Sequence, residues 1–134
     1  MTDTASQRRT KALVVDDTGV VRALFELALA SAGYDVLGTA WPSDALAACA
    51  TSTPDVAFID IFLQRESSTG LELIRAIHAE YPTVRIVAMS GGGPSGDFDV
   101  LLRAKDLGAR ATLAKPIRWE QILEVVQQVL APDR

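Results

Sequence analysis

Short apolar runs alternate with longer amphipathic stretches along this chain of 134 residues. Apolar runs of about four to eight residues are typical of buried strands, whereas apolar positions three and four residues apart are typical of helices. The pattern predicts strands at 11–15, 35–39, 55–59, 84–89 and 111–114. It predicts helices at about 19–32, 42–51, 69–81 and 97–107, and a last one whose apolar side includes positions 122, 123, 126, 129 and 130. Strands and helices are therefore expected to alternate along the whole chain.

Turn-forming residues separate these segments. Gly33 and Gly108 stand where the first and fourth helices should end, since glycine readily adopts the left-handed backbone of a helix C-terminus. Pro42 suits the first turn of the second helix. The sequence TGLE at 69–72 matches a capping box, which predicts the start of the third helix. These signals agree with the limits that the apolar pattern predicts.

Strands and helices that alternate in this way form a doubly wound parallel sheet, an α/β fold. The runs 55–59 and 84–89 are apolar at most positions, as in strands that carry helices over both faces. Ligands of such sheets bind at the carboxyl ends of the strands, where the strand order reverses. We therefore expect the functional residues directly after the strands.

Polar side chains follow four of the predicted strands at the point where each ends. Asp16 and Asp17 follow the first strand, Asp60 the third, Ser90 the fourth and Lys115 the fifth. Because the strands are expected to be parallel, these side chains should converge in one crevice. Three carboxylates, a hydroxyl and an ammonium group in one place are suited to hold a divalent cation and a phosphoryl group.

The chemistry of this set can be predicted further. Carboxylates that lie close together repel one another, and a bound divalent cation removes that cost. A small number of oxygen ligands favours Mg²⁺, which completes its coordination with water and phosphate. Asp60 is then expected to be the nucleophile that becomes an aspartyl phosphate. Lys115 and Ser90 are expected to stabilise the oxygens of the transferred group.

Composition narrows the class of protein. The length suits one domain, expected at 11–131, after a polar and flexible segment at 1–10. The net charge of -4 argues against a nucleic-acid partner. The lone Cys49 is expected to be a small core residue. No apolar run suits a membrane span, and the N-terminus lacks the apolar part of a signal peptide, so we expect a cytoplasmic protein.

Taken together, these motifs resemble the receiver domain of two-component signalling, over residues 11–130. The resemblance implies a flavodoxin-like (βα)5 fold with strand order 2-1-3-4-5. It also implies a single-domain response regulator with no output domain in this chain. The motifs that carry it are VVDD at 14–17, ID at 59–60, GLEL at 70–73, MSG at 89–91, LGA at 107–109 and LAKP at 113–116.

The resemblance assigns roles to the residues at the strand ends. Asp60 matches the phosphoacceptor, which takes its phosphoryl group from a phosphohistidine of a histidine kinase or phosphotransfer protein. Asp17, Asp60 and the backbone carbonyl of Phe62 match direct Mg²⁺ ligands, and Asp16 acts largely through water. Lys115 pairs with the phosphoryl group before a cis-proline turn, and Ser90 matches the switch hydroxyl.

The resemblance also implies how such a chain works with partners. It would catalyse only its own phosphorylation and dephosphorylation, and its output would be binding to a protein target. Neither nucleic acid nor a membrane is an expected partner. A homodimer through the fourth helix, fifth strand and fifth helix is compatible with the family.

Two positions depart from the family pattern. Thr112 stands where an aromatic residue usually accompanies the switch hydroxyl, so we expect the glycine-rich loop at 91–96 to carry more of the conformational change. Phe62 is a bulky residue beside the acceptor, and it either shields the acyl phosphate from water or packs on its own loop.

Other functions remain as alternatives. A phosphorelay intermediate and a receiver-like module that binds partners without phosphorylation share all the motifs above. A phosphatase with an aspartate nucleophile would need a second acid two residues further on, where Thr18 and Gly19 stand. A flavin-binding module would need a phosphate loop of hydroxyl residues and glycines after the first strand, where the chain has carboxylates.

Overall fold

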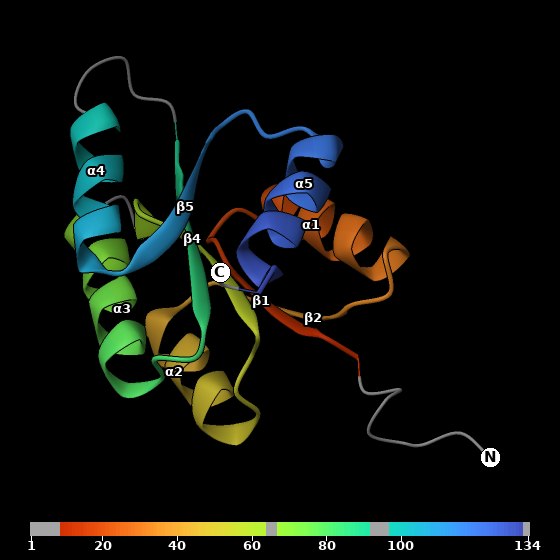
Figure 1. The fold of residues 1–134 in the computed structure, drawn as a ribbon. Coiled ribbons are helices and arrows are strands. Elements are labelled where there is room, and N and C mark those ends of the chain that lie inside the picture. Colours follow the sequence, from red (N-terminus) through yellow and green to blue (C-terminus); the bar gives the residue numbers. More distant parts are fainter. Residues whose placement is uncertain (1–8, 64–66, 92–96, 133–134) are drawn as a thin grey trace.

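A computed structural model describes residues 9–63, 67–91 and 97–132. In these ranges strands and helices alternate as predicted (Figure 1). Residues 1–8 of the segment expected to be flexible lie outside the described ranges. The strands are β1 (Lys11–Val15), β2 (Asp35–Thr39), β3 (Val56–Asp60), β4 (Arg85–Ser90) and β5 (Ala109–Ala114). The helices are α1 (Gly19–Ser31), α2 (Pro42–Thr51), α3 (Ser67–Glu80), α4 (Asp97–Leu107) and α5 (Trp119–Leu130).

Two element starts differ from the prediction by two residues. The third helix begins at Ser67 rather than at position 69, so the capping-box sequence lies within its first turns. β5 begins at Ala109 rather than at position 111, because Ala109 pairs with Ile86 of β4. The register then shifts, and Ala111 pairs with Val87. Local sequence does not encode this irregularity, which depends on the neighbouring strand.

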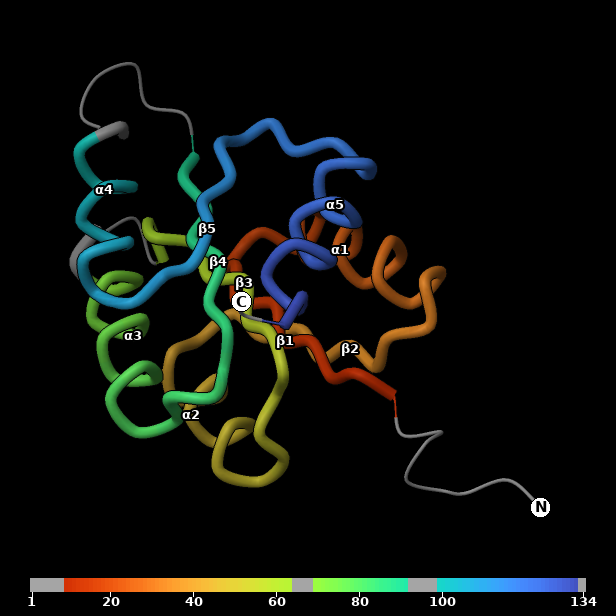
Figure 2. Tube along the Cα trace, in the orientation of Figure 1, coloured from red at the N-terminus to blue at the C-terminus, as the bar shows by residue number. Residues whose placement is uncertain are grey.

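The five strands form one parallel sheet in the order β2-β1-β3-β4-β5, as predicted. α1 and α5 lie side by side over one face, whereas α2, α3 and α4 cover the other (Figures 1 and 2). Strand register brings the carboxyl ends together, since Val15 pairs with Ile59, Asp60 with Met89 and Ser90 with Ala114. The polar residues that follow the strands therefore share one edge of the sheet.

Each face of the sheet has its own apolar core. On the α1 and α5 side, the rings of Phe25 and Phe58 lie 5.0 Å apart at their centroids, among residues of β1, β3 and α5. On the other side, Ile59 and Ile86 belong to the same buried cluster as Ile74 of α3. All five residues of β3 are buried. The central strands are thus covered on both faces, as the continuous apolar runs predicted.

Two expectations from composition concern the core and the membrane. Cys49 is fully buried in α2, and burial raises the pKa of its thiol, in agreement with a small core residue. Within residues 9–63, 67–91 and 97–132, none of the helices combines the length and apolar character needed to cross a bilayer.

Gly33, just after α1, has a φ of 95°, the left-handed conformation expected there.

Candidate functional site

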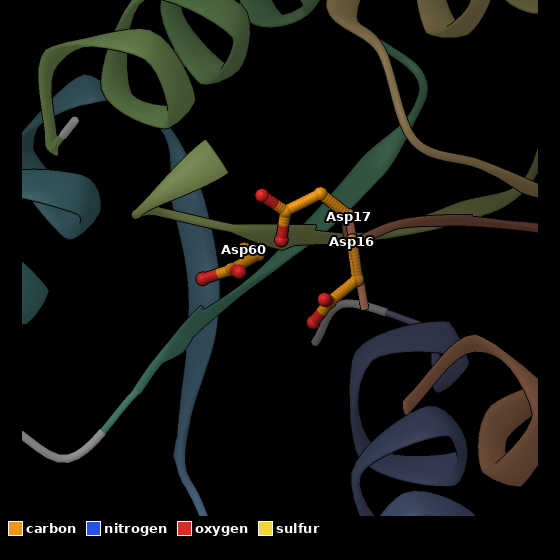
Figure 3. Close-up of side chains that lie close together, drawn as sticks. All are labelled: Asp16, Asp17 and Asp60. Atoms are coloured by element: carbon orange, nitrogen blue, oxygen red, sulfur yellow. The ribbon is translucent and has the colours of Figure 1, made fainter. Parts of the chain in front are cut away.

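Three carboxylates gather at the carboxyl edge of the sheet (Figure 3). Asp16 and Asp17 follow β1, and Asp60 ends β3. One oxygen of each side chain lies within 4.8 Å of the corresponding oxygens of the other two. Asp16 and Asp60 are buried, at 0% and 4% exposure, whereas Asp17 is exposed. The cluster therefore combines two buried carboxylates with one exposed carboxylate.

The turn after β1 is held by its own polar groups. The Asp16 N–H donates to the carbonyl oxygen of Thr39 at 3.0 Å, which extends the β1–β2 pairing by one residue. The Thr18 N–H donates to Oδ1 of Asp16 at 2.8 Å. Thr18 is the N-cap of α1, so neither aspartate serves as the cap. The acidic pair is thus directed to the sheet edge rather than to the helix.

The segment after β3 is built around close backbone contacts. The Phe62 N–H donates to Oδ1 of Asp60 at 3.1 Å, and the Ile61 N–H donates to the Met89 carbonyl at 2.8 Å. The Gly70 N–H donates to the Ile61 carbonyl at 3.1 Å. A Cβ at Gly70 would come within 3.0 Å of the Asp60 and Ile61 carbonyl oxygens. Glycine at position 70 is therefore required for α3 to pack against the end of β3 and the residue that follows it.

Lys115 reaches into the acidic pocket from the end of β5. Its backbone N–H donates to the Ser90 carbonyl at 2.9 Å, and its peptide bond to Pro116 is cis, as the resemblance implied. The ammonium Nζ lies 2.7 Å from Oδ2 of Asp16 and 3.4 Å from Oδ2 of Asp60. The ammonium group therefore bridges the two buried carboxylates.

Burial and charge shift the proton affinities of this cluster. Burial raises the pKa of Asp60 above its ordinary value of 3.8, and the charge of Asp16 raises it further. Lys115 and the Phe62 N–H lower the pKa of Asp60 but do not cancel the rise. Burial acts to lower the pKa of Lys115, yet the hydrogen bond to Asp16 and the charges of both aspartates outweigh burial and raise it. The ammonium group is therefore charged at neutral pH.

Ser90 lies at the same edge, at the end of β4. Its side chain is fully buried, and its Oγ has no hydrogen-bond partner among the described residues. A buried hydroxyl normally has a partner, so this donor is available to a group that enters the pocket. Residues 92–96 of the glycine-rich loop lie outside the described ranges, and the expectation about that loop stays a prediction.

The donor set fits a divalent cation. The cluster brings three carboxylates together around the Lys115 ammonium, and all the acidic donors are oxygen atoms. Both oxygens of Asp16 already have partners, in the Thr18 N–H and the Lys115 ammonium. Both oxygens of Asp60 likewise have partners, in the Phe62 N–H and the Lys115 ammonium, so the assignment of direct metal ligands stays a prediction.

One residue that contacts this site, Arg22, was not predicted from the sequence. Nη1 of Arg22, in the first turns of α1, donates to the backbone carbonyl oxygen of Asp16 at 2.7 Å. A positive charge near a helix N-terminus opposes the helix dipole, which favours acidic residues there. The first turn of α1 contains no acidic residue. Arg22 at this position does not stabilise α1, and this is the signal in the sequence that could have indicated another role for Arg22.

Sequence comparison relates the chain to known regulators. The chain is 30% identical over 118 residues to the nitrogen assimilation regulatory protein NtrX of Azorhizobium caulinodans. That match covers 88% of this chain but 25% of the relative, so the chain spans about a quarter of its length. Sporulation initiation phosphotransferase F of Bacillus subtilis is 26% identical over 120 residues, and the match covers 90% of this chain and 93% of the relative.

Solved structures agree with these relatives. A response regulator from Thermotoga maritima superposes with a TM-score of 0.83 at 25% identity, covering 93% of this chain and 100% of that structure. The receiver domain of NtrX from Brucella abortus gives a TM-score of 0.81 at 29% identity, with 89% and 97% coverage. The family model of the response regulator receiver domain matches residues 12–127. The chain therefore belongs to the response regulator receiver domain family of two-component signalling.

Proposed function

We propose that this chain is a phosphorylation switch in which Asp60 accepts a phosphoryl group from a phosphohistidine. Receiver domains as a family bind Mg²⁺ at an acidic pocket. In this chain Asp17, Asp60 and the Phe62 carbonyl would bind the ion directly, and Asp16 through water. The observation that carries the proposal is the cluster of Asp16, Asp17 and Asp60 around one Lys115 ammonium.

The residues of the pocket suit in-line phosphoryl transfer. A carboxylate oxygen of Asp60 forms the new bond to phosphorus while the bond between phosphorus and the imidazole nitrogen breaks, and the electron pair leaves with the nitrogen. Bound Mg²⁺ supplies charge neutralisation for the phosphoryl oxygens. Lys115, 3.4 Å from Asp60, stabilises a phosphoryl oxygen by its charge, and the Ser90 hydroxyl donates to another.

The exposed apolar face of α1 favours the interpretation that the phosphodonor is a protein. Val20 and Leu27 are 80% and 64% exposed, and Ala23 and Ala30 lie on the same face. A helix that is apolar on its solvent side usually meets a partner. This face begins four residues after Asp16, so a histidine kinase or phosphotransfer protein that reaches Asp60 would cover it.

A phosphorelay intermediate is the second candidate function. The observation that favours it is the match to sporulation initiation phosphotransferase F over 93% of that relative's length. A switch and a relay share the same chemistry at Asp60 and differ in whether the phosphoryl group moves on to a second histidine. A homodimer through α4, β5 and α5 stays a prediction in either case.

The intact mass after incubation with acetyl phosphate tests the proposal. We expect the wild-type chain to gain one phosphoryl group in Mg²⁺ and none in EDTA. Asp60→Asn should gain none, whereas Asp106→Asn, which removes an exposed acid on α4, should behave as wild type. A folded wild-type chain that gains no mass from acetyl phosphate or from a phosphohistidine donor would instead favour a phosphorylation-independent binding module.

A further inference from the structure

We propose that Arg22 is a positioning residue that sets the direction of the Asp17 carboxylate toward bound Mg²⁺. This inference rests on the proposed function, in which Asp17 is a direct ligand. The guanidinium group of Arg22 donates to a backbone carbonyl oxygen, that of Asp16. Its influence on the site would therefore act through the chain between Asp16 and Asp17.

The position of the acceptor atom explains how Arg22 acts on Asp17. The carbonyl oxygen of Asp16, 2.7 Å from Nη1 of Arg22, belongs to the peptide unit that joins Asp16 to Asp17. Rotation of that planar unit would swing the Cα–Cβ bond of Asp17. The bond from the Asp16 N–H to Thr39 and the bond from the Thr18 N–H to Asp16 hold the two sides of the turn. Arg22 holds the peptide unit between Asp16 and Asp17, which lies between these two hydrogen bonds.

The Arg22 side chain lies close to two glycines, Gly38 and Gly19. Its Cδ lies 3.4 Å from the place where a Cβ would stand at Gly38, in the edge strand β2. Its Nη2 lies 3.7 Å from the corresponding place at Gly19. The Arg22 side chain thus runs between α1 and β2, where Glu26 lies still closer to the Gly38 position. A side chain packed in this way loses less freedom on forming its hydrogen bond than an exposed arginine would.

Charge and positioning predict opposite effects of removing Arg22. A guanidinium group near the acidic pocket repels Mg²⁺, so its loss by charge alone should tighten metal binding. If the group holds Asp17 in place, its loss should weaken binding, because residues that orient metal ligands typically contribute about ten- to hundredfold in affinity. The sign of the change therefore separates the two roles.

The test is a calorimetric titration with Mg²⁺ in the absence of any phosphodonor. Arg22→Met keeps the apolar stem between Gly38 and Gly19 but removes the donor and the charge. We expect it to bind Mg²⁺ about tenfold more weakly than wild type. Arg22→Lys, which keeps one charged donor, should recover part of the affinity. Arg103→Ala, which removes an exposed arginine on α4, is the control and should bind as wild type.

Phosphorylation by acetyl phosphate gives a second readout. For Arg22→Met we expect a higher Mg²⁺ concentration at half-maximal rate and a maximal rate close to that of wild type. Thermal unfolding in EDTA verifies that both Arg22 variants are folded. If a folded Arg22→Met binds Mg²⁺ as tightly as wild type or more tightly, the inference is wrong. A wild-type chain without Mg²⁺ affinity would instead contradict the proposed function.

Discussion

At the scale of single residues, the dominant feature is the concentration of charge at the carboxyl edge of the sheet. Asp16 and Asp60 are both buried, and the Lys115 ammonium bridges them. Even with this cation present, burial and the charge of Asp16 raise the pKa of Asp60. The ionised form of Asp60 therefore costs free energy in the folded protein.

From the raised pKa of Asp60 we predict how the free energy of unfolding depends on pH. Because the folded pKa lies above the ordinary 3.8, the contribution of Asp60 to stability is complete below pH 3.8 and is lost as the pH rises through the folded value. In EDTA at neutral pH, Asp60→Asn should therefore be more stable than wild type. Urea unfolding at a series of pH values should show this difference shrinking toward pH 3.8.

The control for this prediction is Asp106→Asn, since Asp106 is exposed on α4. Its stability should follow that of the wild-type chain across the same pH range. A lower stability of Asp60→Asn at neutral pH would mean that the attraction to Lys115 outweighs burial and the repulsion from Asp16.

At the scale of elements, the connections after the strands decide the shape of the site. The chain from β3 to α3 returns so closely that Gly70 bonds to the Ile61 carbonyl. A Cβ at position 70 would come within 3.0 Å of backbone atoms of Asp60 and Ile61. Backbone atoms cannot move aside as the end of a flexible side chain can, so α3 itself would have to shift.

Substitution of Gly70 tests this packing. Gly70→Ala should lower the free energy of unfolding by about 2 kcal/mol or more, because the added methyl group overpacks a closed contact. Gly91→Ala is the matched control, since a Cβ at position 91 meets nothing within 4 Å. Chemical denaturation of both variants measures the difference. Equal stabilities would show that α3 adjusts to the methyl group at little cost.

At the scale of the whole molecule, the site couples local chemistry to global stability. Its groups come from β1, β3, β4 and β5, so the pocket exists only when the sheet is formed. A ligand that binds the folded chain and not the unfolded chain shifts the folding equilibrium by mass action. Metal binding should therefore be visible in the unfolding of the entire domain.

Thermal unfolding should report this linkage directly. At a Mg²⁺ concentration of about a hundred times the dissociation constant, the folded chain should gain about 2.7 kcal/mol and its Tm should rise. The rise should be smaller in Asp60→Asn, which lacks one ligand charge. Sodium chloride of equal ionic strength is the control, and an equal rise in that salt would indicate general screening rather than a metal site.

Much of this molecule could be predicted from its sequence. The alternation of apolar runs with amphipathic stretches reflects burial in a sheet covered on both faces. The positions of the strands and helices in the sequence therefore follow from the local pattern of apolar residues. The residues of the pocket were also predictable, because Asp16, Asp60, Ser90 and Lys115 each occupy the carboxyl end of a strand. In a parallel sheet those ends share one edge.

The tertiary structure alone decided how these residues meet. Lys115 bonds to Asp16 across 99 positions of sequence, and Arg22 reaches the Asp16 carbonyl from α1. The extension of β5 back to Ala109 likewise depends on its pairing with β4. Sequence pattern reports whether a side chain is buried, but hydrogen bonds and ion pairs act over only about 3 Å, and that distance is set by the packing of segments far apart in the chain.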